Sequence, residues 1–209
     1  GAGTLGPVFR GHDTQRERLV AVKVFKLDLK PELTHVLVAG LERIASSGLA
    51  HPAIATPLAA GLTGGSAYLA SDYIAADSMD LAVREFGALL PADAFQVGAR
   101  LASALDHAVA AGFTHGCLHP RDVLMSARDA RLTGIGVGPL LAEIGIAPPV
   151  RRPYSAPERL AGSAWDRRAD IFRLAALVHE LLWGRRISGV GARPGDSLPA
   201  LPRGDLAAL

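Results

Sequence analysis

Glycines at the start of the chain follow the spacing Gly-x-Gly-x-x-Gly, at Gly1, Gly3 and Gly6. Glycine has no side chain, so backbone N–H groups in such a loop can approach a phosphate closely. Dinucleotide-binding folds use the same spacing, and Asp28 lies at a suitable distance for one, but they need a helix directly after the glycines. Pro7 and a β-like run follow instead. The local pattern therefore favours a glycine-rich hairpin over a dinucleotide-binding loop, and an ordinary tight hairpin has the same pattern.

The elements that must position this loop are strands and one helix. Strands are expected at 8–10 and 19–25, with a polar turn at 11–18 between them. A further strand is expected at 68–74, followed by a short connector at 75–77. An amphipathic helix ending near Gly48 is predicted by apolar residues at helical spacing, namely Leu33, Val36, Leu37, Leu41 and Ile44.

The second half of the chain is mostly helical. A long helix is expected after Pro91 and is closed by Gly112, and an apolar helix runs from Asp170 to Gly184. Between them we expect short strands at 114–137 and a glycine- and proline-rich loop that reaches Pro153. The order of elements predicts an α+β fold with two lobes and a cleft between them. We assign residues 1–74 to the first lobe and its connector and 75–209 to the second.

Composition narrows the class of protein. The chain has 209 residues, 49% of them apolar and 20% charged, which is enough for a well-buried domain. The net charge is +2 without a long basic run, so neither nucleic acid nor a membrane surface is an expected partner. Cys117 is the only cysteine, which excludes an internal disulfide and favours a cytoplasmic compartment. No apolar stretch is as long as a membrane span.

Several short motifs, in their order along the chain, resemble the Ser/Thr protein kinase family, especially its bacterial members. The resemblance covers nearly the whole chain. The motifs are Gly1 to Gly6 followed by Val8, then Val20-Ala21-Val22-Lys23, Glu42, His115-Gly116-Cys117, Gly134-Ile135-Gly136, Ala156-Pro157-Glu158 and Asp170. Because the glycine loop begins at residue 1, we expect the chain to be a fragment of a larger protein. The second lobe is expected to be incomplete after the Asp170 helix.

The resemblance implies a nucleotide site in the cleft. Gly1, Gly3 and Gly6 would approach the phosphates, and Lys23 would hold them while Glu42 anchors Lys23. The adenine would lie between Val8, Ala21 and Leu124, with Ser71 behind it and the connector at Asp72 and Ile74 beside it. Without the resemblance, these residues could equally be core packing, a solvated lysine and a surface glutamate.

The catalytic loop departs from the family pattern. Cys117 replaces the aspartate that accepts the substrate proton, and such a base is worth about 10²- to 10⁴-fold in rate. A thiol with the ordinary pKa of about 8.5 is a poor substitute. His119 replaces a lysine that neutralises the transferred phosphate. We expect Cys117 to fill space rather than act as a nucleophile.

Metal binding is affected too. Gly134 replaces the main metal-binding aspartate, and an alignment shifted by two residues places Gly136 there, again without a carboxylate. Magnesium needs one or two carboxylates in such a site. Asp122 occupies the position of the metal-binding asparagine and could ligate a cation, which is the best argument for residual activity.

The regulatory residues are missing as well, whereas architectural ones remain. No serine, threonine or tyrosine occurs at 137–153, and Gly116 replaces the arginine that would pair with a phosphorylated side chain. His115, Glu158 and Asp170 match structural residues of the family. Their ordinary alternatives are a proline-containing turn and a helix N-terminal acid.

Together these departures predict a pseudokinase that binds an unidentified protein partner in signalling or regulation. We expect weak ATP binding without magnesium. The alternatives are a slow ATP-dependent kinase that uses Asp122 for the metal and a scaffold that binds no nucleotide. The domain is expected in the cytoplasm, either free or as part of a larger, membrane-anchored protein.

Overall fold

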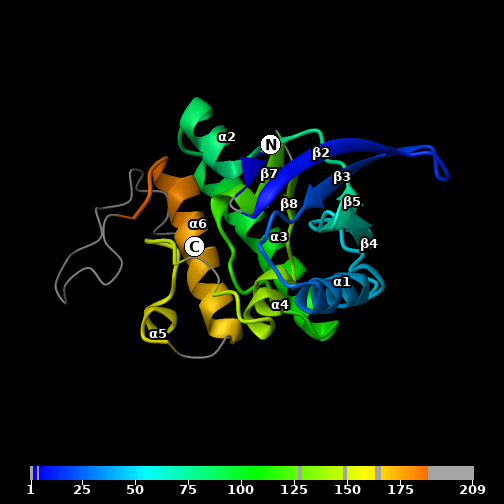
Figure 1. Ribbon diagram of the computed structural model, residues 1–209. Coiled ribbons are helices and arrows are strands. Elements are labelled where there is room, and N and C mark those ends of the chain that lie inside the picture. Colours follow the sequence, from blue (N-terminus) through cyan, green and yellow to red (C-terminus); the bar gives the residue numbers. More distant parts are fainter. Residues whose placement is uncertain (1, 4, 127–128, 148–149, 163–165, 188–209) are drawn as a thin grey trace.

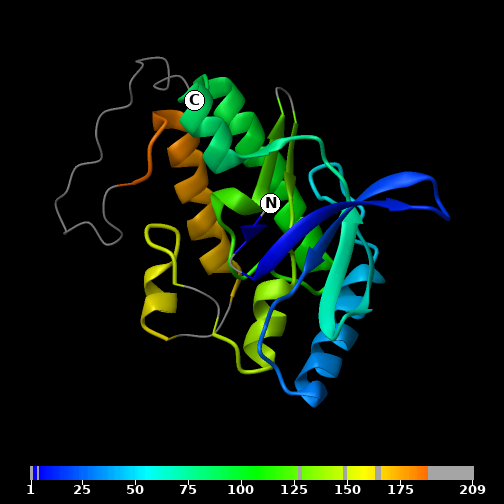
Figure 2. The ribbon, with the colours of Figure 1, turned by 45° about the horizontal axis from the view of Figure 1, so that its top comes forward.

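The chain folds into a β-rich part and a mainly helical part. A computed structural model describes residues 2–3, 5–126, 129–147, 150–162 and 166–187. Five antiparallel strands form one sheet in the order β1-β2-β3-β5-β4. Their bounds are β1 Ala2–Gly3, β2 Gly6–Asp13, β3 Arg18–Val24, β4 Pro57–Thr63 and β5 Ser66–Asp72. Figures 1 and 2 show this sheet to the right of helix α6 (Arg167–Trp183).

The register of the sheet brings together residues from separate motifs. Val8 on β2 pairs with Lys23 on β3, and Ala21 on β3 pairs with Ser71 on β5. Alternate residues of a strand point to opposite faces, so Ala21 and Lys23 share one face. Valines make up much of β3 and favour the pleated strand conformation. One face of the sheet therefore presents the lysine and the residues paired beside it.

Helix α1 (Pro31–Ala45) packs on the sheet through its apolar stripe. Of the apolar residues expected on this stripe, Leu37, Leu41 and Ile44 are buried and Leu33 is partly buried, whereas Val36 is 51% exposed; Gly40 is buried beside them. The helix begins at Pro31, where the missing N–H costs no intrahelical hydrogen bond. The contacts of α1 are with β4 and β5 and, on another side, with helix α4.

The helical part also contains a second, three-stranded sheet of order β6-β7-β8, which α2 and α3 contact. Helix α3 packs along α6, and glycines with left-handed φ angles, Gly112 and Gly184, follow the ends of these two helices. The bounds are β6 Asp77–Ser78, α2 Met79–Phe86, α3 Pro91–Ala110, the 3₁₀ turn η1 Pro120–Asp122, β7 Val123–Ser126, β8 Asp129–Leu132, α5 Pro157–Leu160 and α6 Arg167–Trp183.

One expectation from the sequence is wrong. The glycine- and proline-rich loop that was expected to reach Pro153 contains helix α4 (Val137–Glu143). Val137, Leu140 and Leu141 are buried at helical spacing. Pro139 lies in the first turn, where backbone N–H groups have no intrahelical partner, so it does not interrupt the helix.

The α+β architecture predicted from the sequence is confirmed. The strand-rich part carries α1, and the rest is mainly helical around α6 (Figure 1). Among the described residues, no helix has both the length and the apolar composition needed to cross a membrane. Residues 188–209, for which the sequence shows little periodicity, lie outside the described part.

Candidate functional site

Lys23 of β3 lies at the centre of the expected nucleotide site. Its ammonium donates a hydrogen bond to the backbone carbonyl of Gly6, with Nζ 2.6 Å from the oxygen. Burial lowers the pKa of Lys23; the negative charge of Asp122 opposes this shift, and the positive charge of Arg151 adds to it. Asp122 and Arg151 come from distant parts of the sequence. The fold therefore brings one carboxylate, Asp122, and a second cation, Arg151, close enough for their charges to act on Lys23.

The ion pair between Lys23 and Glu42 is not formed in this structure, which corrects the expectation drawn from the resemblance. Glu42 is exposed on α1, and Lys23 donates to Gly6 instead. The inward face of α1 is taken by Gly40 and by Leu140 of α4, where a Cβ atom on Gly40 would be 2.2 Å from Leu140 Cδ1. The packing of α4 thus fixes a rotation of α1 that leaves Glu42 outside.

Replacement of Glu42 by alanine is accordingly expected to change the free energy of unfolding by less than about 0.5 kcal/mol, as at other exposed sites. Leu41→Ala is the adjacent control. This side chain is fully buried, so its truncation should cost about 2 to 5 kcal/mol. Urea denaturation of both variants measures the contrast. A loss above about 1.5 kcal/mol in Glu42→Ala would indicate a buried partner for the carboxylate, contrary to this structure.

The glycine loop forms a tight hairpin between β1 and β2. Gly3 pairs with Gly6, and Gly6 has φ of +125°, a conformation that side chains rarely allow. A Cβ atom there would also lie 2.2 Å from the carbonyl oxygen of Val24. Position 6 thus requires glycine for backbone reasons alone, which agrees with the hairpin alternative as well as with phosphate binding. Gly1 lies outside the described residues.

The residues expected around the adenine come from four strands and the connector after β5. They are all partly exposed, as an open cleft wall would be. Asp72 forms an ion pair with Arg18 at 3.5 Å, so its side chain faces the β2–β3 hairpin rather than the connector. The members of this set are Val8 on β2, Ala21 on β3, Ser71 and Asp72 on β5, Ile74 in the connector and Leu124 on β7.

Hydrogen bonds to α6 and to Thr133, which follows β8, hold the segment that resembles the catalytic loop. Asp170 of α6 accepts the backbone N–H groups of His115 at 2.9 Å and of Gly116 at 3.0 Å. The His115 ring is buried, with Nε2 2.9 Å from the carbonyl oxygen of Thr133. These are the architectural roles that the resemblance implies for His115 and Asp170. Glu158 lies in the first turn of α5.

At the position of the catalytic base, Cys117 is packed against helix α4. A Cβ atom on Gly138 would lie 3.0 Å from Cys117 Sγ, a tight contact that glycine avoids. Burial, and secondarily the charge of Asp122, raises the pKa of Cys117 to about 12. The thiol is therefore neutral at pH 7, and a thiol in that state is a poor nucleophile.

Burial also shifts the pKa values of two other residues of the loop, His119 and Asp122. Burial lowers the pKa of His119 to about 4, helped by the charge of Arg151. Its Nδ1 accepts the backbone N–H of Arg121 at 3.2 Å. Burial raises the pKa of Asp122, although the charges of His115, Arg151 and Lys23 oppose that shift. The loop thus holds one carboxyl group that is costly to ionise and one uncharged imidazole.

Gly134, at the position of the main metal ligand, has φ of +78° and open space around its Cα. In the parts of the chain that the structure describes, no three histidine, cysteine, aspartate or glutamate side chains come together as a metal-ligand group. Asp122 remains the best candidate for a carboxylate that ligates a cation, because its charge acts on the Lys23 ammonium.

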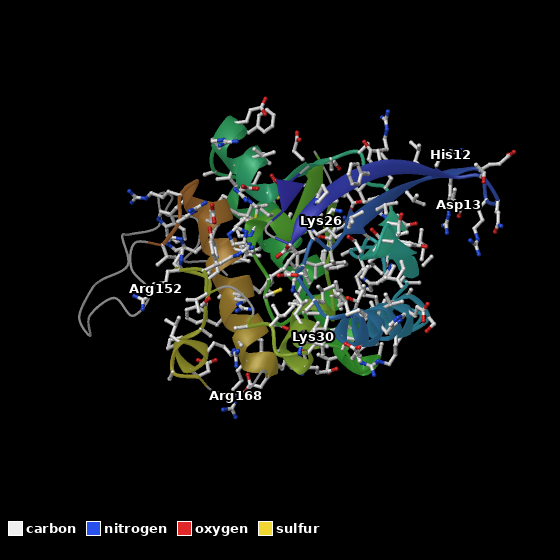
Figure 3. The ribbon with its side chains drawn as sticks, in the orientation of Figure 1. His12, Asp13, Lys26, Lys30, Arg152 and Arg168 are labelled. Atoms are coloured by element: carbon white, nitrogen blue, oxygen red, sulfur yellow. The ribbon has the colours of Figure 1, made fainter. Side chains whose placement is uncertain are left out.

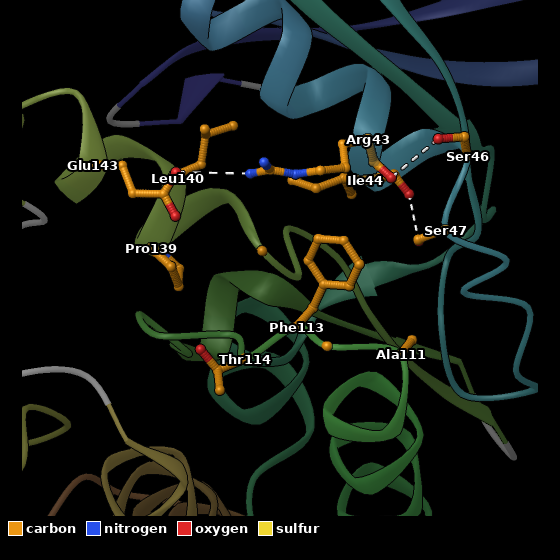
Figure 4. A pocket seen from close by; sticks show the side chains of 12 residues that line it. Arg43, Ile44, Ser46, Ser47, Ala111, Phe113, Thr114, Pro139, Leu140 and Glu143 are labelled. Atoms are coloured by element: carbon orange, nitrogen blue, oxygen red, sulfur yellow. Dashed lines mark hydrogen bonds and ion pairs between the residues drawn. The ribbon is translucent and has the colours of Figure 1, made fainter.

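A cavity of about 550 Å³ lies between α1, α4 and the end of α3 (Figure 4). Phe113 and Leu140 line it, and Arg43 forms an ion pair with Glu143 at 3.7 Å across its edge. None of the residues expected to bind nucleotide contributes to its wall. The cavity follows from the docking of α4 on α1, which sequence patterns did not indicate.

Sequence reasoning also missed Arg173, which is 4% exposed in the middle of α6. Its guanidinium donates to the carbonyl oxygens of Gly116 and Tyr154. The available signal was a charged residue between the apolar Phe172 and Leu174, three positions after Asp170 on the expected helix.

A sequence model described as the protein kinase domain matches residues 1–193. The chain belongs to the protein kinase family. It is 32% identical over 194 residues to the serine/threonine-protein kinase PknD of Mycobacterium tuberculosis, covering 88% of this chain and 28% of PknD. It is 31% identical over 213 residues to PknE of the same organism, covering 95% of this chain and 37% of PknE. The chain thus spans about a third of these relatives' length.

Solved structures support the same fold. The crystal structure of the M. tuberculosis PknI kinase domain superimposes with a TM-score of 0.71 at 24% identity, covering 93% of this chain and 75% of that chain. This likeness shows the protein-kinase fold, with a β-rich lobe and a helical lobe, that the motifs indicated.

Proposed function

We propose that this kinase domain is catalytically impaired and acts as a pseudokinase that binds ATP weakly without magnesium. The observation that carries the proposal is the absence of a carboxylate at both Cys117 and Gly134. In the family these positions supply the proton acceptor and the main metal ligand. The neutral Cys117 thiol replaces neither.

The neighbouring groups do not compensate for these losses. His119 is uncharged at pH 7, so it does not neutralise a transferred phosphate as a lysine would. Asp122 is a single carboxyl group whose burial favours the protonated form. Helix α4 packs on Cys117 and leaves Glu42 outside, so Lys23 lacks its anchoring glutamate in this arrangement. Chemistry and conformation both favour low phosphate transfer.

Nucleotide binding without a metal has a physical basis in the positive charges of the cleft. Lys23 and Arg151 both act on Asp122, and they could neutralise phosphate oxygens in place of a cation. The partly exposed Val8, Ala21 and Leu124 supply apolar contact area for a purine. The phosphates must displace the Gly6 carbonyl from Lys23, which is one reason for weak affinity.

ATP in EDTA-containing buffer is expected to raise the melting temperature. A ligand at one hundred times its Kd stabilises the native state by about 2.7 kcal/mol. For a two-state domain of this size the shift is about 5 to 11 °C. Lys23→Ala should reduce it. Lys26→Ala should not, because Lys26 is an exposed lysine whose ammonium lies 3.4 Å from Ser66 Oγ (Figure 3).

Two other outcomes would contradict this proposal. A shift that requires magnesium and disappears in Asp122→Ala would favour the second candidate, a slow Ser/Thr protein kinase. That candidate is supported by the charge of Asp122, which acts on Lys23. The absence of any shift at millimolar ATP would favour a scaffold that binds no nucleotide. Under each of these outcomes we propose a cytoplasmic domain that binds a protein partner. Nucleic acid is not the expected partner, because the sequence has no long basic run.

A further inference from the structure

The buried guanidinium of Arg173 joins two segments that are far apart in the sequence. Its Nε donates to the carbonyl oxygen of Tyr154 at 3.2 Å, and its NH1 donates to the carbonyl oxygen of Gly116. Asp170, one turn earlier on α6, accepts the N–H of the same Gly116. Helix α6 therefore binds the N–H and the C=O of one glycine in the catalytic-loop segment. A buried charge is costly unless it is hydrogen-bonded in this way.

The same helix also holds the side chain of Tyr154. Its hydroxyl donates to Glu180 Oε2 at 2.5 Å, and its ring meets the His119 ring edge-on at 4.9 Å between centroids. Tyr154 is 1% exposed. Arg173 and Glu180 are seven residues apart, which places them on one face of α6. Residues 151–155 are thus fixed between α6 and the catalytic-loop segment by contacts to backbone and side chain.

The turn at 151–155 has its own hydrogen bonds. The N–H groups of Tyr154 and Ser155 donate to the carbonyl oxygen of Arg151 at 2.8 and 2.9 Å, and the Arg151 N–H donates to Ser155 Oγ at 2.9 Å. These bonds shape the turn. Its hydrogen bonds to α6 are at Tyr154, whose carbonyl oxygen accepts from Arg173 and whose hydroxyl donates to Glu180.

No residue at 137–153 can carry a phosphate on a hydroxyl, so a charge added there cannot control this attachment. Position 116 also cannot take a long side chain. Gly116 has φ of +75°, and a Cβ atom on it would lie 2.7 Å from Pro139 Cδ. Besides Arg151, whose charge acts on Asp122, α6 supplies a cation, Arg173, that hydrogen-bonds to both segments.

We infer that Arg173 is a positioning residue that permanently fixes the 151–155 segment against the catalytic loop, without need of phosphorylation. The charge that holds the segment belongs to the Arg173 side chain and is not added by phosphorylation. Residues 151–155 therefore keep one arrangement and present it unchanged to whatever the domain binds. This inference is independent of nucleotide binding.

Trypsin provides a direct test, because it can cut the Arg151–Arg152 bond but not a bond that precedes proline, as at Arg152–Pro153. The main variant is Arg173→Met, which has a similar length and no donors. Arg168→Met is the matched control, since Arg168 is an exposed arginine near the start of the same helix and points away from the protein (Figure 3). Arg173→Lys keeps the positive charge, but its N–H donors are all on one nitrogen atom.

In Arg173→Met, loss of hydrogen bonds from a charged donor should raise the cleavage rate at Arg151–Arg152 by about 10- to 100-fold. Hydrogen exchange of the Tyr154 and Ser155 amides should rise by a similar factor. Amides in the middle of α3, such as those of Leu101 and Ala104, should not change. Arg168→Met should match the wild type, and Arg173→Lys should fall between the wild type and Arg173→Met.

Two results would overturn the inference. Equal acceleration at 151–155 and in α3 would mean that Arg173 supports the whole fold and has no positioning role. Unchanged cleavage and exchange in Arg173→Met would mean that the segment is held without it. If Arg173→Met does not fold, the same local-against-global comparison in Arg173→Lys decides between these readings.

Discussion

With ATP, magnesium and a generic protein substrate, the wild-type chain is expected to transfer phosphate at least about 10²- to 10⁴-fold more slowly than the 1 to 100 per second typical of the family. The loss of a general base accounts for a factor of that size. Cys117, with a pKa of about 12, does not take up the proton of a substrate hydroxyl at neutral pH. The missing carboxylate at Gly134 lowers the rate further, because magnesium is less well held.

Autophosphorylation and transfer to the substrate should be measured together with variants of the cleft. Lys23→Ala should remove whatever slow turnover remains, since the lysine at this position holds the phosphates in the family. Turnover within the usual range of the family, abolished by Lys23→Ala, would refute the pseudokinase proposal. Slow turnover that disappears in Asp122→Ala would instead assign a metal-binding role to Asp122.

Local patterns predicted most of the regular structure. Strand β3 and helices α3 and α6 have strong periodicity and clear end signals such as Gly112 and Gly184, so each lies close to where it was expected. Helix α4 was missed because its sequence is short and contains glycine and proline. It is stabilised by burial of Leu140 against Gly40 of α1, a long-range contact that no local pattern shows.

The candidate site was predictable in its residue types but not in its geometry. The motifs placed Lys23 on a strand and Asp170 beneath the catalytic loop, because these positions depend on the order of the elements. The orientation of Glu42 depends on how α1 is rotated, and the packing of α4 determines that rotation. The contacts of Arg173 likewise depend on the fold around α6.

The buried His119 ring should make the stability of the protein depend on pH. Burial lowers its pKa from the ordinary 6.5 to about 4 in the folded state, and the residue is 8% exposed. The unfolded chain therefore binds a proton at a higher pH than the folded chain does. The contribution to stability is complete above about pH 6.5 and is lost as the pH falls toward 4. This difference in pKa corresponds to a loss of about 3 kcal/mol in the free energy of unfolding at the acid end of the range.

The measurement is urea denaturation of the wild type and of His119→Gln between pH 8 and 4.5. The free energy of unfolding should fall more steeply for the wild type over the acid half of this range, and the two curves should converge there. Contributions from His51 and His179, whose pKa values burial also lowers, are present in both proteins and cancel in the difference. His35→Gln is the control at an exposed histidine. Parallel curves for the wild type and His119→Gln would show that the imidazole at position 119 can be protonated without cost, and that His119 could supply positive charge to a phosphate after all.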